Sequence, residues 1–293
     1  MDKITLPSTA TRLIKPRPPP PPPPIVAPKT PTATTPNAGL LFREKLLYLS
    51  SLNVNPHKAL NLNPAIRSAP LSTLLSVEKC LLSMGLPRRS IGRILDMHPS
   101  LLTAHPDLHL YPVLDFLLNE VPLPFPHISP SIVRCPRLLV SPISSQLRPA
   151  LAFLRSLGFA LDSHSSLLLV YDVERSLLRK IRFLQGLGFS EEEVRTMVVR
   201  SPATLTYSVE GNLGPKADYF LAQMKGDLEE LNRFPQYFSF SLEQKIKPRH
   251  QMLAQYGLRL PLSKMLKVSD AEFTDTLLDL RLEKLEKMER RHT

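Results

Sequence analysis

The chain has 293 residues, of which 43% are hydrophobic and 22% are charged, enough for a sizeable core and at most about two domains. It carries 31 prolines and 10 glycines without a glycine period, which excludes a collagen-like chain. The longest charge-free stretch of the body, residues 121–133, is too short and too rich in proline for a membrane span. Two distant cysteines, Cys80 and Cys135, disfavour a disulfide framework or a thiol metal site, and fit a reducing compartment.

The net charge of +11 is divided into +4 in residues 1–39, +5 in residues 40–280 and +2 in residues 281–293. A positive chain favours polyanionic partners. Because the body is only mildly basic, a nucleic-acid surface there depends on how the charges are arranged.

Residues 1–39 contain one acid, Asp2, many Ser and Thr residues, and an unbroken proline run from Pro18 to Pro24. The run predicts a polyproline II rod, and the acid-poor, hydroxyl-rich remainder resembles an organelle transit peptide. The absence of an arginine-lined amphipathic helix favours the chloroplast over the mitochondrion. The alternative is a disordered Pro-rich tail that binds an SH3-like or WW-like partner.

The body repeats with a period of about 34 residues, in two columns that keep a constant phase. The first column is a small or proline residue followed by apolar ones, and begins at Pro64, Pro99, Pro136, Ser165, Pro202 and Pro235. The second is an apolar pair that often precedes Leu-Gly, and begins at Cys80, Phe116, Phe153, Phe183, Phe220 and Met252. Such regularity predicts a repeat fold.

One repeat is predicted to be a long helix, a glycine turn, a shorter helix and a proline stop. Ser141-Pro142 is expected to cap the long helix, and Gly158 to end it in the left-handed conformation. Ser190 and Glu193 form a predicted capping box for the shorter helix, which stops before Pro202. The intervals from Pro136 to Ser165 and from Pro202 to Pro235 are shorter than the others, which predicts that the second helix shrinks there.

No single repeat can bury its own apolar face, so neighbours are expected to stack into a curved solenoid with a concave surface. Residues 40–63 are interpreted as an N-terminal capping unit. A final helix is predicted from Ser269, with the exposed pairs Glu283/Lys287 and Glu286/Arg290. The expected domains are a Pro-rich segment (1–39), a repeat domain (40–270) and a charged C-terminal helix (271–293).

The phrases Phe153-Leu-Arg-Ser-Leu-Gly-Phe159 and Phe183-Leu-Gln-Gly-Leu-Gly-Phe189, with the endings Val133-Arg-Cys-Pro136 and Val198-Val-Arg-Ser-Pro202, resemble the mTERF repeat. The family is named for mitochondrial transcription termination factors and is expanded in plant organelles. Tetratricopeptide positions are not met. Ser165 in place of proline and Met224-Lys225-Gly226 in place of Leu-Gly depart from the pattern.

The resemblance implies an all-α, right-handed-type superhelical solenoid of two-helix repeats, whose groove takes nucleic acid. The favoured function is double-stranded DNA binding by a monomer in chloroplast transcription termination or regulation. RNA binding in transcript maturation or intron splicing is the alternative. A repeat scaffold for a protein partner, without nucleic acid, is the rival from another class, and the mild charge of the body supports it.

Phosphate contacts require Lys or Arg at successive repeats, and such residues recur at similar phases. They are Arg88, Arg89 and Arg93; Arg134 and Arg137; Arg179, Lys180 and Arg182; Arg195 and Arg200; and Lys245, Lys247 and Arg249. The competing interpretation is that they form the solvated convex face that any helix pair needs. Tyr207 and Tyr237 are predicted to be exposed and able to stack on bases.

Enzymatic motifs are lacking, so the chain is not predicted to be an enzyme and no cofactor is expected. His105 and His109 are four residues apart, but Pro106 intervenes, so they are not expected to share a helix face as a zinc pair would. The acidic run from Glu191 to Glu193 is explained by helix capping.

Overall fold

The computed structural model describes residues 36–290. The chain divides into two parts, residues 1–40 and 41–293, and the description here is of the second part. The predicted transit peptide and polyproline rod lie outside the described residues. Residues 36–290 contain helices, turns and loops and no strand, which confirms the all-α class. In this range no helix is both long and apolar enough to cross a bilayer.

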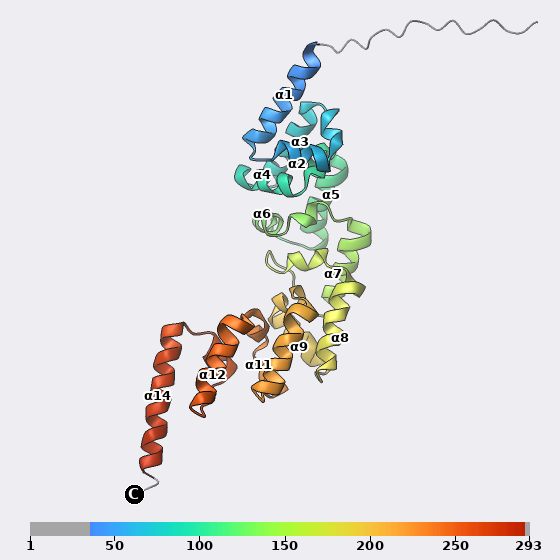
Figure 1. Cartoon of the computed structure of the whole chain (residues 1–293). Coiled ribbons are helices and arrows are strands. Elements are labelled where there is room, and N and C mark those ends of the chain that lie inside the picture. Colours follow the sequence, from blue (N-terminus) through green and yellow to red (C-terminus); the bar gives the residue numbers. More distant parts are fainter. Residues whose placement is uncertain (1–35, 291–293) are drawn as a thin grey trace, which may run out of the picture. The chain divides into compact units, whose positions relative to one another are not determined.

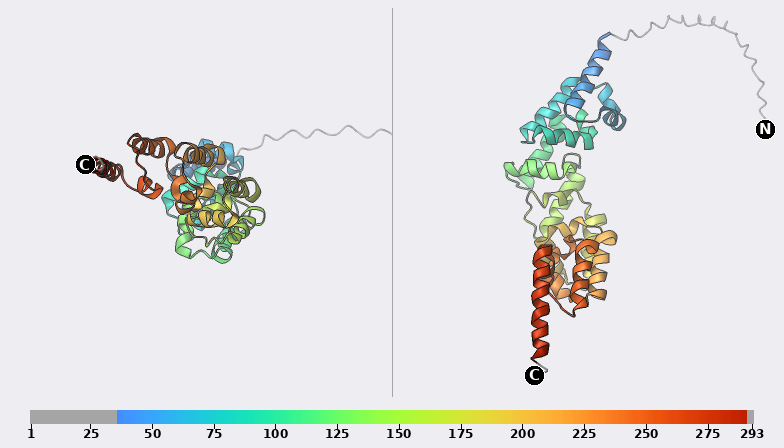
Figure 2. Two further views of the ribbon diagram at one scale, coloured as in Figure 1. Left: turned by 90° about the horizontal axis from the view of Figure 1, so that it is seen from below. Right: turned by 60° about the vertical axis from the view of Figure 1, so that its left-hand side comes forward.

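The second part is a succession of repeats in which a first helix is followed by a second helix, as predicted, with one exception described below. A short 3₁₀ turn ends each repeat except the last. Figures 1 and 2 show the repeats following one another in chain order. First helices are built on α1 (Pro36–Ser51), α3 (Leu71–Ser83), α5 (Tyr111–Asp115), α7 (Arg148–Ser156), α8 (Leu178–Gly186), α10 (Gly214–Asp218) and α12 (Lys247–Gln255). Second helices are α2 (Pro56–Leu62), α4 (Arg88–Met97), α6 (Phe125–Arg134), α9 (Glu191–Arg200), α11 (Leu228–Arg233) and α13 (Leu262–Leu266). The hand of the superhelix and the domain boundaries stay predictions.

The 3₁₀ turns coincide with the first sequence column. They are η1 (Pro64–Arg67), η2 (Pro99–Thr103), η5 (Pro136–Leu139), η7 (Ser166–Val170), η9 (Pro202–Thr206) and η12 (Pro235–Ser239). The residue before each proline adopts nearly one conformation, for example φ −130° and ψ 80° at Cys135 and φ −139° and ψ 74° at Ser201. Proline sterically excludes its predecessor from the α region, so the second helix must end there.

From α5 onward, each first helix opens with a single π turn. These turns are η3 (Pro106–Leu110), η6 (Ile143–Leu147), η8 (Val173–Leu177), η10 (Val209–Leu213) and η13 (Leu242–Ile246); two more, η4 (Phe116–Glu120) and η11 (Tyr219–Gln223), extend α5 and α10. The predicted Ser141-Pro142 cap is wrong. Pro142 occupies the cap position and its carbonyl accepts from the Leu147 N–H at 3.2 Å, while the Ser141 hydroxyl turns back to the Arg137 carbonyl.

The two short intervals act as predicted. Between Pro136 and Ser165 the second helix is absent, and residues 157–165 form turns instead. Between Pro202 and Pro235 the second helix, α11, has only 6 residues, against 10 in α9. Gly158 and Gly188 end their first helices at φ +88° and +113°, which confirms the left-handed caps.

The capping predictions at the remaining helix ends are confirmed. Ser190 with Glu193, and Ser269 with Glu272, form reciprocal capping boxes. A further cap that was not predicted is Asn55, whose side chain accepts from the Lys58 N–H at the start of α2. The final helix, α14 (Asp270–Glu289), carries the exposed pairs Glu283–Lys287 and Glu286–Arg290. It lies beside α12 in both ribbon figures, and the Lys284 ammonium donates to the Tyr256 carbonyl at 2.6 Å.

Candidate nucleic-acid interface

Four basic residues lie inside the repeats rather than on their surfaces. We call Lys45, Lys180, Lys216 and Arg249 the closing bases; their side chains are between 2% and 6% exposed. Each stands on a first helix and donates hydrogen bonds to backbone carbonyls at or near the end of the same repeat. They satisfy carbonyl groups that a short turn leaves without partners, so each closes its repeat by a charge-assisted hydrogen bond.

The geometry of the closing bases is repeated along the chain. The Lys45 ammonium donates to the carbonyls of Ile66, Arg67 and Ala69 at 3.0, 2.6 and 2.8 Å, around the end of η1. Lys216 donates to the Phe238 carbonyl in η12 at 2.7 Å, and Lys180 donates to the Leu205 carbonyl in η9. In the repeat that begins at Ile143, a neutral side chain replaces the base: the Gln146 amide donates to Tyr171 at 2.8 Å.

Two of the closing bases also touch an aromatic ring of the preceding repeat. The Lys180 ammonium lies 4.5 Å from the ring centre of Tyr171, and that of Lys216 lies 5.6 Å from the ring centre of Tyr207. The cation–π contacts therefore tie one repeat to the next. Burial lowers the pKa of Lys180 to about 8, because desolvation disfavours the charged ammonium.

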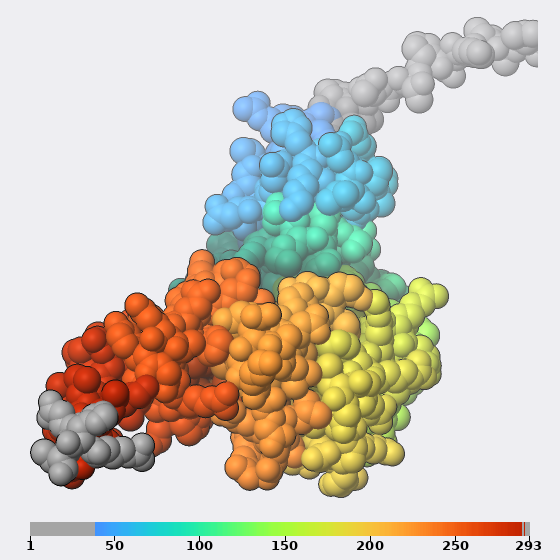
Figure 3. Space-filling view, turned by 60° about the horizontal axis from the view of Figure 1, so that its bottom comes forward, coloured from blue at the N-terminus to red at the C-terminus, as the bar shows by residue number. Residues whose placement is uncertain are grey.

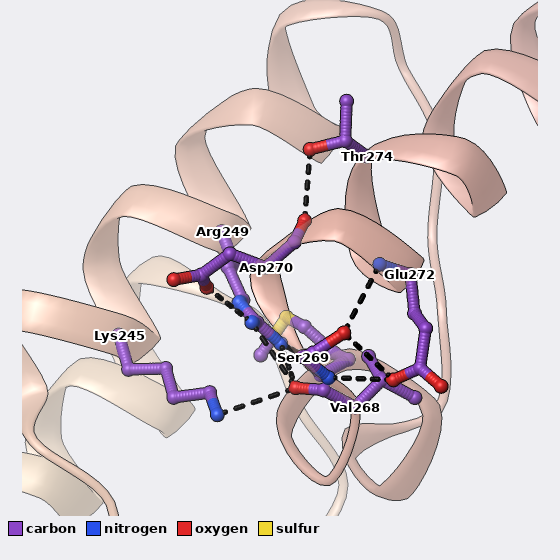
Figure 4. A network of polar contacts seen from close by, with 8 residues as sticks. Lys245, Arg249, Val268, Ser269, Asp270, Glu272 and Thr274 are labelled. Atoms are coloured by element: carbon purple, nitrogen blue, oxygen red, sulfur yellow. Dashed lines mark hydrogen bonds and ion pairs between the residues drawn. The ribbon is translucent and has the colours of Figure 1, made fainter.

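The last closing base anchors the final helix (Figure 4). The Arg249 guanidinium donates to the Met265 carbonyl at 2.6 Å and to the Val268 carbonyl at 3.1 Å, and it pairs with Asp270 at 2.5 Å. This pairing holds the pKa of the Asp270 carboxyl below its usual value. One buried guanidinium thus joins α12, the end of α13 and the first turn of α14.

The structure therefore divides the predicted phosphate contacts into buried and exposed groups. Lys180 and Arg249 are buried closing bases, and Lys245 is half-buried and donates to the Val268 carbonyl at 3.3 Å. The exposed members with acidic partners are Arg88 with Glu78, Arg179 with Glu210, Arg195 with Glu192, and the half-exposed Lys247 with Glu243. Exposed members with other partners are Arg93, which donates to the Val133 carbonyl, Arg134, beside His164, and Arg200. Within residues 36–290, the side chains of Arg89, Arg137 and Arg182 have no hydrogen-bond or ion-pair partner.

The prediction that Tyr237 is exposed is wrong. Its side chain is fully buried, packs against Phe220 and Phe238, and donates to the Lys216 carbonyl at 3.0 Å. The residue belongs to the first sequence column, where the helix-ending turn faces the core. Tyr207 is half-buried beside Lys216 and keeps part of its ring accessible.

A second set of basic residues marks the C-terminal ends of four of the six second helices. Arg134, Arg200 and Arg233 are the last residues of α6, α9 and α11, and Lys267 directly follows α13. We call these four residues the second-helix edge. All are exposed, and positive charge at a helix C-terminus is favoured by the carbonyl end of the helix dipole.

Three residues of the second-helix edge line one depression. Arg200, Arg233 and Lys267 border a hollow of about 470 Å³, where the Arg200 guanidinium donates to the Arg233 carbonyl at 2.9 Å. Asp227, Glu229 and Glu230 lie at the same hollow, but each has an internal partner: Asp227 caps α11, Glu229 pairs with Arg233, and Glu230 accepts from the Leu262 N–H. Arg200, Arg233 and Lys267 are exposed, as are Asp227 and Glu229, so both signs of charge border this hollow. Figure 3 shows that the repeats from α8 to α12, coloured yellow to orange-red, lie side by side on one face.

The histidines predicted to be a poor metal pair are both exposed. His105 lies 3.7 Å from Asp107, and the His109 ring lies 3.2 Å from the His105 carbonyl. No cluster of three or more potential metal ligands occurs within residues 36–290.

Residues 132–274 match the family model described as mTERF. The matched range begins in α6 and ends in α14, and so contains the closing bases Lys180, Lys216 and Arg249 and all four residues of the second-helix edge. This region of the chain, residues 132–274, is an mTERF region.

Curated proteins similar to this chain are transcription termination factors named as chloroplastic. MTERF4 of Zea mays is 34% identical over 102 residues, which are 35% of this chain and 20% of the relative. MTERF5 of Arabidopsis thaliana is 41% identical over 86 residues, 29% of this chain and 17% of the relative. MTERF8 of Arabidopsis thaliana is 25% identical over 195 residues, 65% and 38% respectively. The matched part of the chain thus spans well under two thirds of these relatives.

Two members of the second-helix edge, Arg233 and Lys267, were missed by the sequence reasoning. A signal for the first exists in the mTERF region: Arg134-Cys-Pro136, Arg200-Ser-Pro202 and Arg233-Phe-Pro235 share an Arg-x-Pro spacing. The spacing places arginine on the last turn before the proline stop in these three repeats. Lys267 carries no such signal, because no proline follows it.

Proposed function

We propose that this chain binds nucleic acid along the second-helix edge and acts in organelle gene expression. The single observation that carries the proposal is that an exposed cation recurs at the C-terminal end of four second helices, α6, α9, α11 and α13. Packed helices lie about 8–10 Å apart, and a nucleic-acid strand carries a phosphate about every 3.4 Å of rise. One cation per repeat therefore corresponds to about three nucleotides.

The polymer that we propose is double-stranded DNA, bound by a monomer, and the process is transcription termination or its regulation. The names of the chloroplast relatives support this choice of process and compartment. RNA bound during transcript maturation or splicing uses the same phosphate chemistry, so it is an outcome of the same experiment. The proposal gives the chain no enzymatic activity and no cofactor.

The test is binding of the purified chain to organelle double-stranded DNA and to single-stranded RNA of matched length, each over a series of salt concentrations. The variant Arg134→Gln/Arg233→Gln/Lys267→Gln removes three edge charges and spares Arg200, which bonds to a neighbouring helix. We expect the slope of log affinity against log salt to fall by about two to three and the unfolding temperature to be unchanged.

The matched control removes the same charge from predicted residues outside the edge, as Arg88→Gln/Arg89→Gln/Arg182→Gln. Equal losses in the two variants would mean that binding follows bulk charge rather than the edge. A preference of the native chain for RNA would redirect the proposal to transcript processing. Weak binding to both polymers would contradict it.

A protein partner is the second candidate, because α14 exposes a stripe of apolar residues. Leu278, Leu282 and Leu285 are each about half exposed and recur at intervals of four and three residues. This spacing lies along one helix face. If the native chain binds neither polymer, this stripe is the surface from which a search for a partner would start.

A further inference from the structure

The second helices follow one another along the array, and we call them the row of second helices. Within residues 36–290 the row has one break: the repeat that contains η6 and η7 has no second helix. Residues 157–165 replace the helix by a short turn, in which Asp162 accepts from the N–H groups of His164 and Ser165 at 2.9 and 2.7 Å and from the Ser165 hydroxyl at 2.7 Å. These bonds define the turn. The place of a helix in the row is therefore taken by a compact, well-bonded loop.

The turn glycine of this repeat is uncovered, whereas in two other repeats the next second helix covers it. A Cβ built on Gly188 would lie 3.1 Å from Leu228 of the following second helix, and one built on Gly85 would lie 3.8 Å from Ser129. At the equivalent Gly158, no atom lies within 4 Å of the same point. The following helix, α9, therefore does not close over this glycine.

The uncovered place is a hollow of about 210 Å³ between Gly158 and α9. Arg195, Thr196 and Arg200 line it from α9, with Glu192 as the single acid among the lining residues. Among residues 36–290, the single ion-pair partner of Arg195 is Glu192, at 3.3 Å, and both side chains are exposed. An exposed pair of this kind contributes little free energy, so the guanidinium can exchange its partner at small cost.

We propose that this hollow seats a phosphate of the nucleic-acid strand, bound by the Arg195 guanidinium and the Thr196 hydroxyl, with Arg200 beside it. The inference rests on the proposed function and adds a subsite to it. Charge complementarity selects this occupant, since arginine forks and hydroxyl groups are the usual donors to phosphate.

A docked protein helix fits the hollow less well. A helix with its side chains is about 10–12 Å wide and needs an apolar stripe on its receptor. The hollow offers as apolar surface Val199, which is 37% exposed, and the half-buried Leu157. Its volume suits a sugar-phosphate group better than a helix.

The break also lies next to the second-helix edge. Arg134, at the end of α6, contacts the ring of His164 in the loop, and Arg200, at the end of α9, lines the hollow. A strand that follows the edge from α6 to α9 must therefore pass the loop. The phosphate bound in the hollow would give the strand a contact between α6 and α9, where the second helix and the cation at its end are missing.

The experiment uses the full chain and compares three single variants for binding to the polymer that the native chain prefers. We expect Arg195→Ala to weaken binding about three- to tenfold and to reduce the salt slope by about one. Thr196→Trp, which fills the hollow without changing charge, should weaken binding and leave the unfolding temperature unchanged. Glu192→Gln, which releases Arg195, should strengthen binding.

The matched control is Arg290→Ala, because Arg290 forms a similar exposed pair with Glu286 at 3.2 Å on α14. We expect no change in affinity beyond a general charge effect. If the native chain binds but Arg195→Ala equals this control and Thr196→Trp binds as the native chain does, the inference is overturned while the proposed function stands. If the native chain binds neither polymer, both fail.

Discussion

Two stretches of the repeat array use the same helical plan with different interiors. From Val173 to Leu266, every first helix carries a buried lysine or arginine that closes its repeat. From Pro106 to Val170, the equivalent positions are the apolar Val113 and Ala150, and Gln146 makes the only comparable closure between these bounds. A buried cation is therefore not required by the fold. Where it occurs, it substitutes charge-assisted bonds for part of the packing.

The comparison also shows that a lysine or arginine in a repeat is not by itself evidence of a contact with a ligand. Lys180 and Arg182 are two residues apart on α8, yet the first is buried in its own repeat and the second is exposed. Successive side chains of a helix point in different directions, so the members of a basic cluster cannot all face the same side. Only the member whose direction meets solvent is available to a phosphate.

The largest effect is expected from removing the closing base that joins three helices. Arg249→Met should lower the free energy of unfolding by about 3 kcal/mol, because the buried Met265 carbonyl loses its side-chain donor and the Val268 carbonyl keeps only Lys245. Urea denaturation measures the loss, and amide exchange should show α14 released first. The exposed Arg290→Met is the control, with an expected change of less than about 0.5 kcal/mol. Equal effects would contradict the role of Arg249.

A second prediction introduces a buried lysine into the stretch from Pro106 to Val170, whose first helices lack one. Ala150→Lys should cost about 2 kcal/mol of stability, because the new ammonium is buried where Gln146 already bonds to the Leu169 and Tyr171 carbonyls. Gln146→Ala alone should cost about 1 kcal/mol. In the double variant the freed carbonyls can accept from the lysine, so the combined loss should be smaller than the sum. Strictly additive losses would show that position 150 cannot reach these carbonyls.

The smallest effect is a dependence of stability on pH. The folded pKa of Lys180, about 8, lies below the unfolded value near 10.5, so between these values the unfolded chain binds more protons. Stability should therefore rise with pH, by about 1 kcal/mol between pH 8 and 9.5, and Lys180→Met should flatten the rise. Lys45 and Lys216 have pKa values lowered by burial and contribute in the same direction. Thermal unfolding across this range is the measurement, and a slope unchanged in Lys180→Met would remove Lys180 as its source.

Much of the fold could be predicted because its signals are local. The prolines at 99, 136, 202 and 235 forbid the α region to their predecessors, and the capping boxes at Ser190 and Ser269 satisfy their own helix ends, so sequence spacing sufficed. The π turns were not predicted, since their register depends on how the first helix meets its neighbours. The candidate interface was predicted only in part, because the exposure of a lysine or of Tyr237 is decided by contacts between residues more than 20 positions apart.

The extended residue before each proline has a further consequence, for tolerance to insertion and deletion. Because the backbone at Cys135, Ser201 and Phe234 is fixed by the next residue, each repeat restarts in the same direction whatever the length of the segment before it. Length changes are then absorbed within one repeat and are not passed on as a register error. The repeat that lacks a second helix, at residues 157–165, is also the one in which Ser165 replaces the proline and lies in the α region at φ −87° and ψ −16°. The array nevertheless resumes its plan at the following repeat. Such a chain can vary the spacing of its surface groups one repeat at a time while the rest of the array keeps its form.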